Sequence, residues 1–174
     1  MKGVSHVLVG TAAVMLVHDR VPLADSLTGL VPVALATLLG SLLPDVDSDE
    51  STLRQATGTA RSQGVVGRIA SGIVRVFGGH RGALTHSLFA WGLVVTLAGV
   101  YFRGNMTWVA FSLGYLSHLA ADALTVDGVP LLWPLVHRRM RLLPALLAIR
   151  TGGAREYLVM VAIGVAVVLV YWVW

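Results

Sequence analysis

Apolar segments constrain this chain more than any other feature of its sequence. Five of them are separated by polar connections, and they cover residues 5–17, 27–43, 84–102, 107–125 and 156–174. The chain is 56% hydrophobic and only 13% charged, whereas a soluble domain carries about 25% charged residues. The last three segments approach the ~20 residues that cross a bilayer, and the first two are shorter. This pattern predicts an all-α, multi-pass membrane bundle of about five helices, forming one domain over residues 1–174.

The beginning of the chain allows a second interpretation. The stretch MKGVSHVLVGTAAVML resembles a secretory signal peptide, with Lys2 as its positive region. No convincing A-x-A-like cleavage site follows, and His6 is unusual inside a disposable apolar core. We therefore expect this segment to stay in the protein as its first helix.

The arginines predict the orientation. The connections 45–83 and 126–155 carry five arginines each, and the other connections carry only Arg20 and Arg103. By the positive-inside rule, both arginine-rich connections and the N-terminus face the cytoplasm across the inner membrane. In so apolar a chain, the net charge of +4 is a signal of orientation in the membrane. The partners that we expect are therefore membrane lipids and not nucleic acid.

Arginines also recur within the first of these connections. Arg54, Arg61, Arg68 and Arg75 are seven residues apart, with apolar residues between them. The spacing is typical of a helix lying on the lipid surface with its arginines near phosphates. Several glycines weaken that helix, so a flexible positive loop is the alternative.

Polar side chains that can bind metals lie at the expected cytoplasmic end of all five segments. They are His6, Asp45, Asp47, His80, His86, His118, Asp122 and Glu156. Chance alone would not place such residues at one depth in every segment. We therefore predict a metal site at this end of the bundle.

The strongest pair is His118 and Asp122, which are four residues apart and share a helix face. A buried ionisable pair requires a ligand or a partner, and the alternative is a hydrogen bond that joins two helices. Asp45 and Asp47 follow Pro44, which ends a helix, so both carboxylates can point to one site. Their alternative is a solvated helix end.

The remaining candidates are each open to two or more interpretations. His86 is the better ligand of the motif HRGALTHS, whereas His80 is a ligand, a proton shuttle or a solvated loop residue. Arg81 is suited to hold a phosphate oxygen, or it only sets the orientation. Glu156 is a metal ligand, a base, or an acid at a helix N-terminus.

The chemistry follows from these residue types. The chain has no cysteine, and histidine with carboxylate ligands suits Zn²⁺ best, with Mn²⁺ or Fe²⁺ as alternatives. A metal with an open position activates water and polarises a phosphoryl oxygen. Asp45 would act in catalysis as a metal ligand or bridging group. Asp47 or Glu156 would orient or deprotonate the water, and Arg81 would hold the substrate phosphate. We predict a hydrolase for a phosphoester, with a phospholipid-type substrate at the cytoplasmic membrane face.

Five motifs in order resemble a known family. SHVLVG, GSLLPDVD, HRGALTHS, GYLSHLAADALTVDGVPLLWP and RTGGAREYL resemble the YdjM-like family, described as LexA-regulated, inner-membrane, metal-dependent hydrolases. The chain is more distantly similar to zinc-dependent bacterial phospholipase C. That similarity implies six metal-binding positions: His6, Asp45, His86, His118, Asp122 and Glu156. Gly152 stands where that group has a histidine, which favours one or two ions, with Asp47 and His80 as replacement ligands.

Two other functions use the same residues. A non-catalytic membrane protein could use a fully enclosed metal to hold its helices together. An ion or proton carrier could use the residues as a relay, but it needs polar residues in the outer half of the membrane. Little beyond Thr96 is polar there in the third and fifth segments, so the carrier is the least favoured function.

Overall fold

The computed structural model describes residues 1–18, 27–47, 84–101 and 106–173 of the chain. Its regular elements are α1 (Gly3–His18), α2 (Leu27–Leu42), the 3-10 helix η1 (Leu43–Asp47), α5 (Leu88–Tyr101), α6 (Met106–Ala123) and α7 (Ala154–Val173). All of these are helices, which confirms the all-α prediction. Each of the five apolar segments forms one α-helix.

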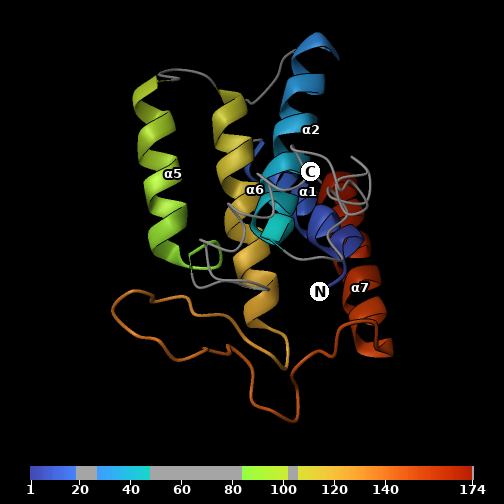
Figure 1. The fold of residues 1–174 in the computed structure, drawn as a ribbon. Coiled ribbons are helices and arrows are strands. Elements are labelled where there is room, and N and C mark those ends of the chain that lie inside the picture. Colours follow the sequence, from blue (N-terminus) through green and yellow to red (C-terminus); the bar gives the residue numbers. More distant parts are fainter. Residues whose placement is uncertain (19–26, 48–83, 102–105, 174) are drawn as a thin grey trace, which may run out of the picture.

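Helix α6 is the centre of the bundle. It packs against α1, α2 and α5, and α7 packs against α1 (Figure 1). The buried apolar cluster joins Val14, Val33 and Ala36 to Ala110 on α6. Ala36 on α2 and Ala110 on α6 are small, which lets these two helix backbones approach one another closely.

The closest approach is between α2 and α6. A Cβ atom added to Gly40 would lie 2.1 Å from the carbonyl oxygen of Phe111, and one added to Gly114 would lie 2.6 Å from that of Thr37. Real Cβ atoms do not come so near to backbone oxygens. Glycine is therefore required at both crossing points, which fixes how α2 sits on α6.

Pro44 ends α2, as the sequence predicts. Proline lacks an N–H donor and disfavours the α conformation of the residue before it. The α-helix accordingly stops at Leu42, and the chain continues as η1. This tight turn carries Asp45.

Helix α5 begins later than the sequence predicts. The apolar segment starts at residue 84, but the helix starts at Leu88. The hydroxyl of Ser87 accepts a hydrogen bond from the amide of Ala90 at 3.1 Å, which is an N-cap interaction. Residues 84–87 therefore form a turn, and His86 lies just before the helix.

Residues 124–153 form an irregular segment that is closely bonded to the bundle. Residues near its beginning are joined to later residues by two isolated bridges, one between Thr125 and Ile149 and the other between Val129 and Met140. The amide of Leu88 donates to the carbonyl of Leu131 at 2.9 Å. This segment lies across the ends of α6 and α7 in Figure 1, where it is drawn in orange.

The length and hydropathy of the helices bear on the expected membrane crossings. None of the helices in the described parts of the chain is both long enough and apolar enough to cross a membrane. The expected surface helix that carries Arg54, Arg61, Arg68 and Arg75 lies outside the described residues.

Candidate metal centre

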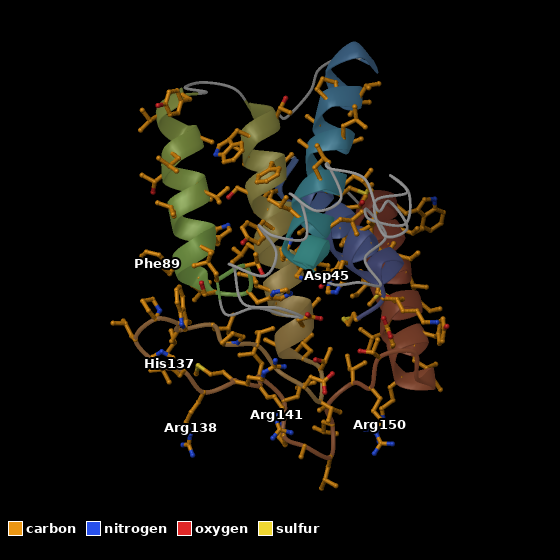
Figure 2. The ribbon with its side chains drawn as sticks, viewed as in Figure 1. Asp45, Phe89, His137, Arg138, Arg141 and Arg150 are labelled. Carbon is orange, nitrogen blue, oxygen red and sulfur yellow. The ribbon has the colours of Figure 1, made fainter. Side chains whose placement is uncertain are left out.

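Five of the candidate side chains converge near the C-terminal half of α6. His118 and Asp122 come from α6 itself, His6 from α1, Asp45 from η1, and His86 from the turn before α5. Asp45 lies between the helices in Figure 2. The four other side chains have no exposed surface, and the Asp45 side chain is 18% exposed. The cluster is therefore buried and reaches solvent at Asp45.

Four of these residues form a compact set of ligand atoms. Asp45, His86, His118 and Asp122 each offer one atom, and these atoms all lie within 4.8 Å of one another. His86 Nε2 is 3.4 Å from both Asp45 Oδ1 and His118 Nε2. His118 Nε2 is 3.8 Å from Asp122 Oδ2. Ligand atoms around a tetrahedral Zn²⁺ with bonds of about 2.0 Å are about 3.3 Å apart, so this set fits such an ion.

The histidine rings are oriented by contacts on their other side. His118 Nδ1 lies 2.7 Å from the carbonyl oxygen of Ser41. Because a carbonyl can only accept, Nδ1 carries the proton and Nε2 presents a lone pair to the cluster. His86 Nδ1 lies 3.0 Å from the hydroxyl of Thr85, which can donate or accept this hydrogen bond and orients the ring with Nε2 toward the cluster.

His6 faces the second oxygen of each aspartate. Its Nε2 atom is 3.3 Å from Asp122 Oδ1 and 3.9 Å from Asp45 Oδ2. The ring stacks on His118 with 3.7 Å between centroids. His6 Nδ1 is buried and has no hydrogen-bond partner among the described residues. Each aspartate therefore offers one oxygen to His86 and His118 and the other to His6.

The N-terminal amino group also contacts this second side. It donates a buried hydrogen bond of 2.6 Å to Asp122 Oδ1. The amino group thus places a positive charge beside the oxygen of Asp122 that faces His6.

The protonation states suit metal binding. Burial alone raises the pKa of Asp45, but the hydrogen bond with His86 and the nearby His118 and His6 outweigh it and hold the pKa at about 2. Burial lowers the pKa of His118 to about 3, and His6 beside it adds to this effect. Near neutral pH the cluster therefore offers an ionised Asp45 and a neutral His118, the forms that bind metals.

Glu156 lies next to the cluster but is occupied by other donors. Its carboxylate accepts hydrogen bonds from the Ser5 hydroxyl at 2.5 Å, the Lys2 amide at 2.8 Å and the Gly152 amide at 2.6 Å. It is not one of the four residues whose ligand atoms group together. Glu156 therefore fixes the start of α1, which carries His6, against the start of α7.

Replacing Glu156 by glutamine should lower both stability and metal affinity. The amide nitrogen of glutamine would face the N–H or O–H donors that now bond to one carboxylate oxygen, and that hydrogen bonding would be lost. We therefore expect the free energy of unfolding to fall by about 1–3 kcal/mol. Zinc affinity should fall because His6 loses its anchor. Thermal unfolding and zinc titration would measure the two effects. Tyr157→Phe removes only the exposed bond to Lys2 and serves as the control; an unchanged melting temperature in Glu156→Gln would contradict the anchoring role.

Three predicted site residues are not placed. His80 and Arg81 lie outside the described residues, and of Asp47 only the backbone, in η1, is described. Conversely, Ser5, Ser41 and the amino group of Met1 contact Glu156, His118 and Asp122, and none of these contacts was predicted from the sequence. Ser41 acts through its carbonyl oxygen, for which no side-chain signal exists. Ser5 carried one signal, a small polar residue next to His6 in an apolar segment.

The comparisons with known proteins agree with the five motifs. A family model described as YdjM inner membrane protein matches residues 1–174. "Inner membrane protein YdjM" of Escherichia coli (strain K12) is 41% identical over 112 residues, which are 60% of this chain and 49% of that protein. The protein of the same name from Shigella flexneri has the same identity and coverage.

A relative from another organism matches more of its own length. "Uncharacterized protein YvsG" of Bacillus subtilis (strain 168) is 29% identical over 140 residues, which are 79% of this chain and 78% of that protein. The chain spans about half the length of the two YdjM relatives. No solved structure matches significantly. Because the family model covers the whole chain, the predicted membership is confirmed: this protein belongs to the YdjM inner membrane protein family.

Proposed function

We propose that this protein is a metal-dependent hydrolase that cleaves a phosphoester at the inner membrane. The observation that carries the proposal is the grouping of Asp45, His86, His118 and Asp122 around one point, with His6 beside them. Four fully buried ionisable side chains, with Asp45 at their exposed edge, are costly to collect in one place. Such a cost is typical of functional sites.

The donor set fits Zn²⁺ best, with Mn²⁺ or Fe²⁺ as alternatives. His86 and His118 with one oxygen of each aspartate would hold the first ion. His6 and the other two oxygens would hold a second ion only if that ion replaced the Met1 amino group, which lies 2.6 Å from Asp122 Oδ1. A zinc ion so bound lowers the pKa of its water to ~7 and polarises a phosphoryl oxygen.

Asp45 is assigned the substrate side. It is the member of the cluster that solvent reaches, with 18% of its side chain exposed. Its low pKa keeps it ionised near neutral pH, which is the form that binds a metal. Asp47 follows it in η1 and remains a candidate for accepting a proton from water. Arg81 remains the candidate for holding the phosphate.

The family and its relatives support an inner-membrane location. Two relatives are named inner membrane proteins, and large apolar side chains such as Leu93, Val161 and Trp172 are exposed on α5 and α7. The ten arginines in the connections 45–83 and 126–155 favour a cytoplasmic position for this end of the bundle. Lipid phosphoesters are then the nearest substrates.

A structural metal is the second candidate function. Four of the five side chains in the cluster are fully buried, as expected for an ion that only holds helices together. The exposed edge at Asp45 favours the hydrolase, because a structural site would be closed. Turnover distinguishes the two functions.

A panel of phosphomonoesters, phosphodiesters and phospholipids would test hydrolysis by the zinc-loaded protein. Asp45→Asn should lower turnover at least about 100-fold, because it removes a metal-binding carboxylate at the solvent-exposed edge of the cluster. His137→Ala is the control, since His137 is exposed and points away from the cluster (Figure 2). If Asp45→Asn turns over as fast as wild type, or if no phosphoester is cleaved above background, the hydrolase proposal fails.

A further inference from the structure

A cavity separate from the metal cluster lies between the 124–153 segment and the start of α7. Its volume is about 580 Å³, within the range of 300–1,000 Å³ that is typical of ligand pockets. Val126, Ala145, Leu146 and Ala148 give it apolar walls, and Arg150 and Arg155 add two positive charges. None of these residues belongs to the cluster.

The two arginines have no acidic partner within the described parts of the chain. Arg155 Nη1 donates to the carbonyl oxygen of Leu146 at 2.5 Å, which holds its guanidinium beside the cavity. The carboxylate of Glu156, the nearest acid in sequence, is engaged by Lys2, Ser5 and Gly152. Two arginines that line one cavity without an acidic partner among the described residues are suited to bind a phosphate.

The surface around the cavity combines arginines with exposed leucines. Leu146 is 85% exposed and Leu147 is 59% exposed. Arg138, Arg141 and Arg150 point away from the helices at this end of the molecule (Figure 2). Such a mixture is unfavourable in water, but it suits an interface with anionic lipid, where leucine enters the apolar layer and arginine meets phosphates.

We propose that this cavity binds one anionic phospholipid, with its phosphate on Arg150 and Arg155 and the start of its acyl chain against Val126, Ala145 and Ala148. A free phosphate would leave the apolar walls uncovered. A zwitterionic lipid would leave an excess of positive charge. The site is independent of the metal chemistry, because it shares no residue with the cluster.

The test measures binding of short-chain phosphatidylglycerol to the purified full chain in neutral detergent, by calorimetry. Phosphatidylcholine with the same acyl chains and glycerol phosphate are the comparison ligands. Wild type should bind phosphatidylglycerol at least about tenfold more tightly than either of them. The double variant Arg150→Gln/Arg155→Gln should lose at least about tenfold in affinity, since two charge-assisted hydrogen bonds are removed.

Matched variants separate the site from general charge and from misfolding. Arg138→Gln/Arg139→Gln removes the same charge outside the cavity and should change affinity less than about twofold. Ala145→Phe fills the cavity but keeps both arginines. It should therefore weaken the binding of phosphatidylglycerol and leave the binding of glycerol phosphate unchanged. Equal loss in both double variants would overturn the proposal. So would equal binding of both lipids, or glycerol phosphate binding as tightly as phosphatidylglycerol.

Discussion

Purified His118→Ala protein is expected to hold less than about a tenth of the zinc that wild type holds at a buffered, limiting zinc concentration. His118 is fully buried in the cluster and supplies one of its four grouped ligand atoms. Even residues that only orient a ligand contribute about 10–100-fold to metal affinity, so loss of the ligand itself should have at least that effect. Asp122→Ala should lose more, because Asp122 offers an oxygen to each of the two proposed positions.

Metal analysis by mass spectrometry would give the zinc content per chain. His137→Ala is again the matched control, because it removes an exposed histidine from the same chain. Since removing a buried side chain can also unfold the protein, each variant's melting temperature should be recorded without metal. Suppose that the His118→Ala protein has the melting temperature of wild type and also holds as much zinc. This result would rule out the cluster as the metal site.

Gly40→Ala should destabilise the protein more than other single-methyl changes in the bundle. The new Cβ would lie 2.1 Å from the carbonyl oxygen of Phe111, and backbone cannot move aside as a side chain can. Separating α2 from α6 should lower the free energy of unfolding by about 3 kcal/mol. Because α2 leads directly into η1, zinc affinity should fall as well. Thermal or denaturant unfolding in detergent would measure the first effect.

Gly92→Ala makes the same chemical change in α5, where nothing lies within 4 Å of the new Cβ. Alanine is a better helix former than glycine, so the free energy of unfolding of this variant should rise by about 0.5–1 kcal/mol. The two variants are thus expected to shift stability in opposite directions. Similar stability of both proteins would show that α2 and α6 are not in close contact.

The helices could be predicted because their signal is local. Apolar runs bounded by polar connections marked all five, and Pro44 marked the end of α2. The start of α5 was misplaced because four residues of its apolar segment form a turn before the cap at Ser87. Hydrophobicity does not distinguish a buried turn from a helix. The same apolar signal suggested membrane crossings, but no helix in the described parts of the chain is both long enough and apolar enough to cross a membrane.

The site was predictable as a set of residues but not as an arrangement. The four-residue spacing of His118 and Asp122 placed both on one face of α6, as observed. How each aspartate divides its oxygens between the histidines depends on side-chain rotation and on distant backbone, so no spacing reveals it. The role of Ser41 follows from a carbonyl that every residue has. Asp47, His80 and Arg81 remain predictions.

The hydrogen bonds of Glu156 have a consequence for the order of events during synthesis. They join residues 154 and 151 positions apart, Lys2 and Ser5 to Glu156. Closing so long a loop has to wait until α7 has left the ribosome. A nascent chain that ends before residue 156 already contains all five converging side chains, but it lacks the carboxylate that holds the start of α1. If His6 takes part in metal binding as proposed, its position in the cluster is completed only after the start of α7 has been synthesised.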